Sequence, residues 1–84
     1  MYRVLVSSRA QKDLRKLPPQ VRDRIVARIR QLGDDPFPDG RKKLKGQAGT
    51  YWRIRVGDFR VLYEVEQGDL VVLVLRAVNR KDAY

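Results

Sequence analysis

Three arginines stand in an alternating pattern on two predicted strands of this 84-residue chain. Arg53 and Arg55 alternate with apolar side chains in residues 51–56, and Arg60 takes a polar position in the next strand, residues 59–66. Because successive side chains of a strand point to opposite faces, all three arginines are predicted on one open face of a sheet. Like charges this close repel each other, so the pattern is typical of a site that binds an anion.

The chemistry open to these arginines is phosphate binding. Guanidinium groups bind phosphate with paired hydrogen bonds and stabilise charge that develops during phosphoryl transfer, but they are poor general bases. The chain has no His and no Cys, which excludes a Ser-His-Asp triad, a thiolate nucleophile and a metal held by either residue. RNA suits such a site, because its 2′-OH is an internal nucleophile beside the phosphate. We expect a 2′,3′-cyclic phosphate and a 5′-OH as products, with no metal or cofactor.

The charge of the whole chain also favours a polyanionic partner. Nineteen Lys and Arg against ten Asp and Glu give a formal net charge of +9 in a single predicted domain, residues 1–84. We predict that further basic residues contact RNA, namely Arg41, Lys42, Lys43, Lys45, Arg76 and Lys81. The alternative interpretation of residues 41–45 is an ordinary charged loop. No apolar run reaches membrane-spanning length and no leader pattern is seen, so we expect a cytoplasmic location without membrane contact.

The elements that must hold the arginines follow from hydrophobic spacing. A strand is predicted over residues 2–6, a helix over 9–17 with Ser8 as N-cap, and a second helix from Pro19 to Gly33. Three further strands are joined by short turns that contain glycine, over residues 51–56, 59–66 and 70–77. This β-α-α-β-β-β order predicts an α+β fold, with a helical hairpin on one face of a mainly antiparallel four-stranded sheet.

Four segments, residues 10–18, 44–46, 51–63 and 72–84, carry motifs that occur together in one family. The most specific is Arg-Val-Gly-Asp-Phe-Arg-Val-Leu-Tyr at residues 55–63. The chain resembles the RelE/ParE superfamily of bacterial toxins over essentially its whole length. The resemblance implies a toxin of a type II toxin–antitoxin pair. RelE-like members are endoribonucleases that enter the ribosomal A site and cut mRNA, whereas ParE-like members inhibit DNA gyrase.

The resemblance also implies which residues form the active site. RelE-like toxins carry basic residues and a C-terminal tyrosine at positions that correspond here to Arg53, Arg55, Arg60, Arg80 and Tyr84. This set favours the RelE-like branch, a metal-independent, ribosome-dependent mRNA endoribonuclease. Two alternatives stay open: a ParE-like gyrase inhibitor without nuclease activity, and a degenerate toxin that only binds its antitoxin. The chain departs from the family in the sequence Ala-Val-Asn-Arg at residues 77–80 and in lacking a C-terminal helix.

A toxin of this type implies an acidic antitoxin as its partner. Such a partner, partly disordered and folding as it binds, would neutralise the +9 charge. Three apolar side chains beside the arginines are predicted to be exposed and to dock it: Leu62, Val72 and Val74. The expected partners are therefore the antitoxin, mRNA and the ribosome, with operator DNA bound only through the antitoxin complex.

Overall fold

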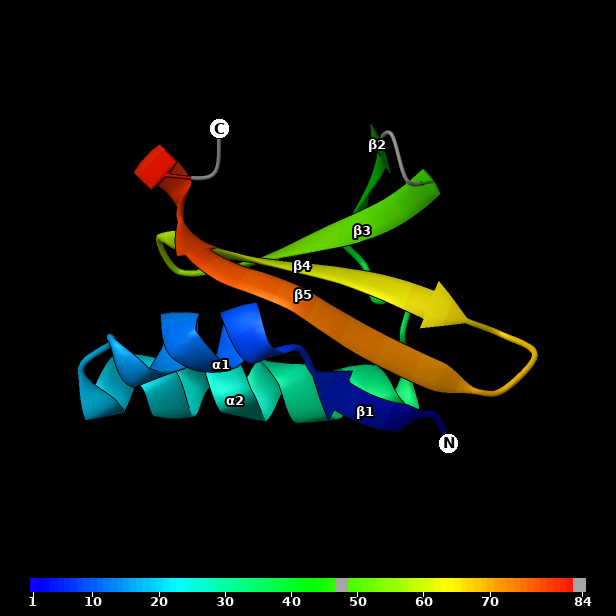
Figure 1. The fold of residues 1–84 in the computed structure, drawn as a ribbon, viewed down its shortest axis with the longest axis horizontal. Helices are drawn as coiled ribbons and strands as arrows, with labels where there is room; N and C mark the ends of the chain where they lie inside the picture. Colours follow the sequence, from blue (N-terminus) through cyan, green and yellow to red (C-terminus); the bar gives the residue numbers. More distant parts are fainter. Residues whose placement is uncertain (47–48, 83–84) are drawn as a thin grey trace.

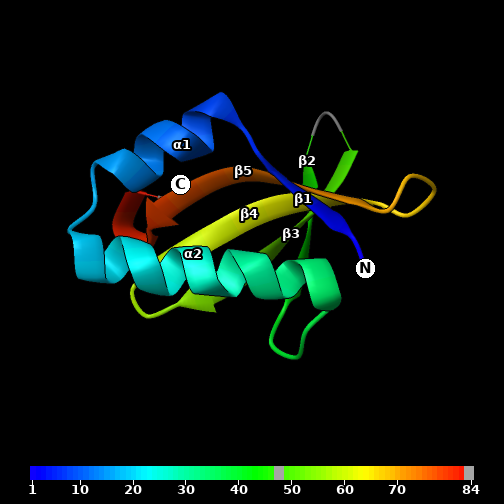
Figure 2. The ribbon, with the colours of Figure 1, turned by 90° about the horizontal axis from the view of Figure 1, so that it is seen from below.

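A computed structural model describes residues 1–46 and 49–82. The elements, in chain order, are β1 (Arg3–Val6), α1 (Ser8–Arg15), α2 (Pro19–Asp34), β2 (Lys42–Gly46), β3 (Gly49–Val56), β4 (Phe59–Glu66), β5 (Val71–Asn79) and the 3₁₀ turn η1 (Arg80–Asp82). The strands form one sheet in the order β1-β5-β4-β3-β2, in which only β1 and β5 pair in parallel. Both helices lie on the same side of this sheet (Figures 1 and 2). The predicted α+β class and the helical hairpin on one face are confirmed.

The sheet has five strands rather than the four that the sequence predicts. The extra strand is β2, which pairs antiparallel with β3. It lies within residues 41–45 and the next residue, for which an ordinary charged loop was the alternative interpretation. An edge strand that is exposed along most of its length needs no apolar alternation, so β2 carries no hydrophobic signal. Its lysines also discourage a further strand from adding to this edge.

The start of α1 lies one residue earlier than predicted. Ser7, not Ser8, is the N-cap, and its hydroxyl oxygen accepts a hydrogen bond from the Ala10 N–H at 3.1 Å. The same hydroxyl donates to the carbonyl oxygen of Leu75 at 2.9 Å, so the cap also fixes the helix to β5. Ser7 is the N-cap because its hydroxyl can accept from a helix N–H and donate to a strand carbonyl at the same time.

Gly33 has a different role from the helix stop that its sequence position suggests. It lies inside α2, which continues to Asp34, and it is buried against β1. A Cβ atom there would lie 3.1 Å from the Tyr2 carbonyl oxygen, and the Tyr2 N–H donates to the Gly33 carbonyl oxygen at 2.7 Å. The glycine therefore permits the close approach of the helix to the chain that enters β1.

The core lies between the helical hairpin and the sheet. Its least exposed large side chains come from α2 and from three strands, β3, β4 and β5: Ile25, Leu32, Ile54, Val61, Tyr63, Val72 and Val74. Tyr63 is the polar member, and its hydroxyl donates to the Pro36 carbonyl oxygen at 2.8 Å. Burial raises the pKa of Tyr63 to about 12, so the hydroxyl stays protonated and holds the α2–β2 loop to the sheet.

The prediction that Val72 and Val74 are exposed is wrong. Both side chains are fully buried beneath the helices. Residues 70–75 are apolar without a break, so alternation could not tell which set of side chains faces the core. The register between β4 and β5 shows which side chains face the core. Leu73 lies opposite Glu64, which is exposed, so Leu73 faces away from the helices. Leu73 and the partly exposed Leu62 thus lie on the helix-free face.

Candidate active site

The three sequence-predicted arginines share the helix-free face of β3 and β4. Arg55 is the direct cross-strand partner of Arg60, and Arg53 is the partner of Leu62. Cross-strand neighbours have Cβ atoms about 5 Å apart, so Arg55 and Arg60 start from positions that one phosphate group can bridge. The predicted grouping of Arg53, Arg55 and Arg60 is therefore confirmed by the register of the sheet.

The arginines are less open than the sequence predicts. Only Arg55 is exposed, whereas Arg53 and Arg60 retain 7% and 8% of their accessible surface. In Figure 1, β2 and η1 both lie on the side of the sheet away from the helices, so this face is flanked at both ends. A sequence shows alternation but not the twist of a sheet, so it could not show that this face is only partly open.

Arg53 has a guanidinium that is partly buried without a partner among the described residues. Its Nε atom is buried without a hydrogen-bond partner, and no carboxylate pairs with its guanidinium among residues 1–46 and 49–82. A buried N–H without an acceptor is unfavourable, and the fold keeps it only because other interactions outweigh it. An anion bound at this face would give the guanidinium a partner.

Arg80 lies at the end of β4 that carries Arg60. It begins η1, and its backbone N–H donates to the Asp58 carbonyl oxygen in the β3–β4 turn at 2.8 Å. Arg60 pairs with Val78, two residues before Arg80, so the two arginines come from adjoining segments. The Arg80 side chain is exposed. Tyr84, the fifth predicted member of this site, lies outside the described residues.

Arg76, predicted as an RNA contact, is engaged within the fold. Its Nε and Nη2 atoms donate to the two carboxylate oxygens of Asp13 at 2.8 and 3.1 Å, and the Ala77 N–H donates to the same carboxylate at 3.0 Å. Burial raises the pKa of Asp13, but the hydrogen bonds from Arg76 and Ala77 outweigh it and leave that pKa below its usual 3.8. The carboxylate thus caps the edge of β5 beyond the end of β1.

Replacing Asp13 by asparagine is expected to lower the free energy of unfolding at neutral pH by about 1–2 kcal/mol, because Arg76 loses its charged acceptor. Since the folded-state pKa lies below 3.8, the stabilisation is complete above 3.8 and is lost as the pH falls through the folded value. Urea unfolding at neutral and acidic pH measures both effects, with exposed Asp23→Asn as the control. Equal stability of Asp13→Asn and the parent at neutral pH would contradict this role.

The other predicted RNA contacts divide between the two faces of the sheet. Lys42 pairs with Arg53 and belongs to the arginine face, whereas Lys43 pairs with Trp52, whose ring packs against the core on the helix side. Arg41, Lys45 and Lys81 are exposed. The alternation in residues 51–56 puts Trp52 among the apolar side chains opposite the arginines, but the sequence gives no sign that its ring lies beside Arg41 and Lys43.

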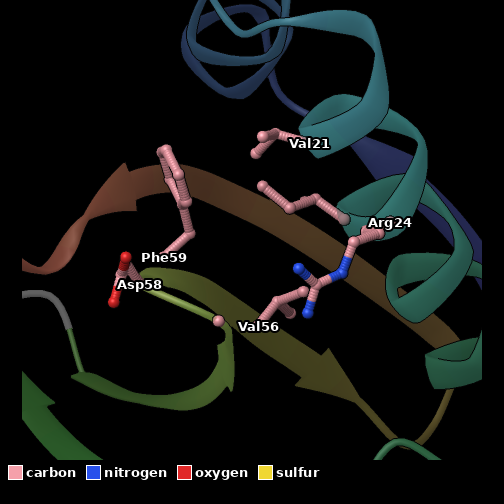
Figure 3. A pocket seen from close by; sticks show the side chains of 7 residues that line it. Val21, Arg24, Val56, Asp58 and Phe59 are labelled. Carbon is pink, nitrogen blue, oxygen red and sulfur yellow. The ribbon is translucent and has the colours of Figure 1, made fainter.

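A hollow of about 160 Å³ lies between α2 and the β3–β4 turn, on the helix side of the sheet. Figure 3 shows Val21 and Arg24 of the helix facing Val56 and Phe59 of the hairpin across this space. It is lined mainly by apolar side chains and contains none of the three clustered arginines. The hollow is therefore separate from the candidate active site.

A helical hairpin on one face of the sheet and clustered arginines on the other agree with the features expected of a RelE/ParE-type toxin. The family model described as "ParE toxin of type II toxin-antitoxin system, parDE" matches residues 4–84, and the chain belongs to this superfamily of type II toxins. The chain is 32% identical over 84 residues to Toxin RelG of Mycobacterium tuberculosis, covering 99% of this chain and 95% of the relative. It is 35% identical over 86 residues to Toxin RelE3 of Methanocaldococcus jannaschii, covering 98% and 94%.

Two similar solved structures of toxin–antitoxin complexes share the fold of this chain. The RelBE2 toxin–antitoxin complex of Mycobacterium tuberculosis superposes with a TM-score of 0.83 at 29% identity, covering 94% of this chain and 98% of the other. The archaeal RelE–RelB complex of Pyrococcus horikoshii gives a TM-score of 0.82 at 31% identity, covering 98% of both. No helix within the described residues is long and apolar enough to cross a membrane.

Proposed function

We propose that this toxin is a metal-independent endoribonuclease that cleaves mRNA presented by the ribosome. The observation that carries the proposal is the cross-strand pair of Arg55 and Arg60, with the buried, unpartnered Nε atom of Arg53 on the same face. Guanidinium groups fixed on rigid strands stabilise charge on a reacting phosphate without reorganising at the moment of reaction. The names of the two relatives, Toxin RelG and Toxin RelE3, support this branch of the superfamily.

The reaction needs no nucleophile from the protein. The 2′-oxygen of the RNA attacks the adjacent phosphorus and gives up its proton, while the bond from phosphorus to the 5′-oxygen breaks and that oxygen gains a proton. Arg53, Arg55 and Arg60 would hold the phosphate in line and stabilise its added charge. Arg80, from the segment adjoining Arg60, would stabilise the leaving oxygen. Tyr84 would assist the 2′-OH or stack on a base.

The ribosome enters the proposal because this face recognises phosphate rather than sequence. Arg53, Arg55 and Arg60 offer charge and paired donors, and contacts of this kind position a nucleic acid without reading its bases. A separate structure must then hold the mRNA with one phosphate at the site. The exposed basic residues, including Lys42, Lys45 and Lys81, would bind ribosomal RNA phosphates, which predicts strong salt dependence.

An acidic antitoxin is the proposed protein partner. The similar solved structures from Mycobacterium tuberculosis, Pyrococcus horikoshii and Methanococcus jannaschii are toxin–antitoxin complexes. Leu62 lies partly exposed beside Arg53 and remains a proposed apolar contact for it, whereas the buried Val72 and Val74 do not. A partner seated there would cover the arginine face and keep RNA from it. Operator DNA would be bound through that complex.

Primer extension on mRNA in a translation reaction tests the proposed activity. The expected result is cuts within codons that require ribosomes, carry a new 5′-OH end and disappear when the nucleotide before the cut lacks its 2′-OH. Intact mRNA during continued translation would overturn the proposal. A gyrase supercoiling assay then tests the second candidate, a ParE-like gyrase inhibitor, which the matching ParE family model favours.

A further inference from the structure

Four side chains form a cationic aromatic cluster at the β2 edge of the sheet, away from the arginine face. The rings of Phe37 and Trp52 meet edge to face, with centroids 5.3 Å apart. The guanidinium carbon of Arg41 lies 5.7 Å from the Phe37 centroid and 5.6 Å from that of Trp52, and the Lys43 ammonium lies 5.9 Å from Trp52. Both cations therefore lie within the range of a cation–π interaction.

The cluster is held in place by the segment between α2 and β2. The Phe37 N–H donates to an Asp35 carboxylate oxygen at 3.0 Å, and the preceding residue, Pro36, accepts the buried Tyr63 hydroxyl. Arg41 is fixed in turn, because its Nη1 atom donates to the carbonyl oxygens of Phe37 and Pro38 at 3.1 and 3.3 Å. A guanidinium fixed in this way loses little further entropy when a ligand contacts it.

The fixed guanidinium of Arg41 keeps binding capacity to spare. The residue is exposed, and its Nε and Nη2 atoms have no hydrogen-bond partner within residues 1–46 and 49–82. A planar guanidinium that rests on aromatic rings can take a second π-system against its outer side, while its remaining donors reach a phosphate. The loop also carries Asp35, which is bound to the Phe37 N–H, and the exposed Asp39, while Lys42 and Lys45 extend the positive charge along β2.

We infer that Arg41, supported by Trp52 and Phe37, is a stacking platform for an unpaired base of single-stranded RNA. RNA is favoured over an acidic peptide because aromatic and guanidinium planes bind bases by stacking. The carboxylates of a peptide would need only a positive charge and would make no use of the stacked planes. The choice of RNA rests on the proposed function. β2 joins the two surfaces, since Lys42 pairs with Arg53 and the next residue, Lys43, pairs with Trp52. A strand of RNA that leaves the arginine face across β2 would meet the platform.

Trp52 is the only tryptophan in the chain, so its fluorescence reports directly on this surface. The test titrates the protein with a short oligoadenylate whose riboses are 2′-O-methylated, which cannot be cleaved through the 2′-oxygen. We expect quenching on binding in the parent. Arg41→Lys keeps the charge but removes the plane, so it should weaken binding about tenfold while leaving the salt dependence unchanged. Arg3→Lys, on the edge strand at the opposite side of the sheet, is the matched control and should bind like the parent.

Equal affinity and equal quenching in Arg41→Lys and the parent would overturn the platform. Because Arg41 also holds its own loop, urea unfolding of the variant is measured alongside, and Lys43→Gln gives a second variant outside that loop. A loss of binding in a stably folded Arg41→Lys, with the parent salt slope, supports stacking. Failure of the proposed nuclease is distinguishable, because quenching would persist in a protein that leaves ribosome-bound mRNA uncut.

Discussion

Replacing Arg60 by alanine is expected to lower the rate of mRNA cleavage on the ribosome about 100- to 1,000-fold, because a fixed donor to the charged phosphate is lost. Arg60 stands opposite Arg55 in the register, so the pair that spans the phosphate is broken. Single-turnover cleavage of mRNA in ribosome complexes measures the effect, since it separates the chemical step from product release. Growth after induction of the variant should be restored in parallel.

Two further variants make the Arg60 result specific. Arg30→Ala removes an exposed arginine of the same charge from α2, on the far side of the sheet, and should leave the rate unchanged. Arg60→Lys keeps the charge but loses the forked donors, so its rate should lie between those of Arg60→Ala and the parent. If Arg60→Ala cleaves as fast as the parent, the role of the arginine face in catalysis is wrong.

Replacing Arg53 by methionine is expected to move stability and activity in opposite directions. The side chain retains 7% of its surface and its Nε is buried without a partner, so an apolar side chain of similar length should raise the free energy of unfolding by about 1–2 kcal/mol. Cleavage should fall at least about 100-fold, because one phosphate donor is removed. Denaturant unfolding and single-turnover cleavage measure the two quantities on the same preparations.

Arg55→Met is the matched control, because Arg55 lies on the same face but is exposed. Its stability should stay within about 0.5 kcal/mol of the parent, as is usual for surface substitutions, while its cleavage also falls. A less stable Arg53→Met protein would show that the buried guanidinium supports the fold, and would contradict its assignment as a charge held for an anion. Comparing Arg53→Met with Arg55→Met thus separates the effect of a buried guanidinium on stability from the effect of a lost arginine on cleavage.

The arginine face could be predicted because β3 and β4 alternate clearly. In these strands Ile54, Val61 and Tyr63 enter the core, and the charged residues between them are forced to the other side. The same method failed in β5, where the unbroken apolar run hides which side chains face the helices. It also failed for β2, since an exposed, lysine-rich edge strand carries no hydrophobic pattern.

Burial of Arg53 and Arg60 and the cluster around Trp52 could not be predicted for a different reason. Both depend on contacts between segments far apart in the sequence. The Arg41 guanidinium meets Trp52 only because β2 pairs with β3, and that pairing has no local signal. The choice of Ser7 over Ser8 as the helix cap is of the same kind, because the deciding partner, Leu75, lies 68 residues away.

The parallel pairing of β1 with β5 has a consequence for how the chain folds as it is synthesised. β1 emerges first, yet its partner β5 follows only after both helices and the other three strands, so this edge of the sheet cannot close early. Pairing between segments this distant has a high contact order, which slows folding because a long loop must close first. Docking of β1 and α1 onto β5 therefore has to wait for the end of the chain, whereas the β3–β4 pair that carries the arginines is joined by a short turn and does not depend on β1.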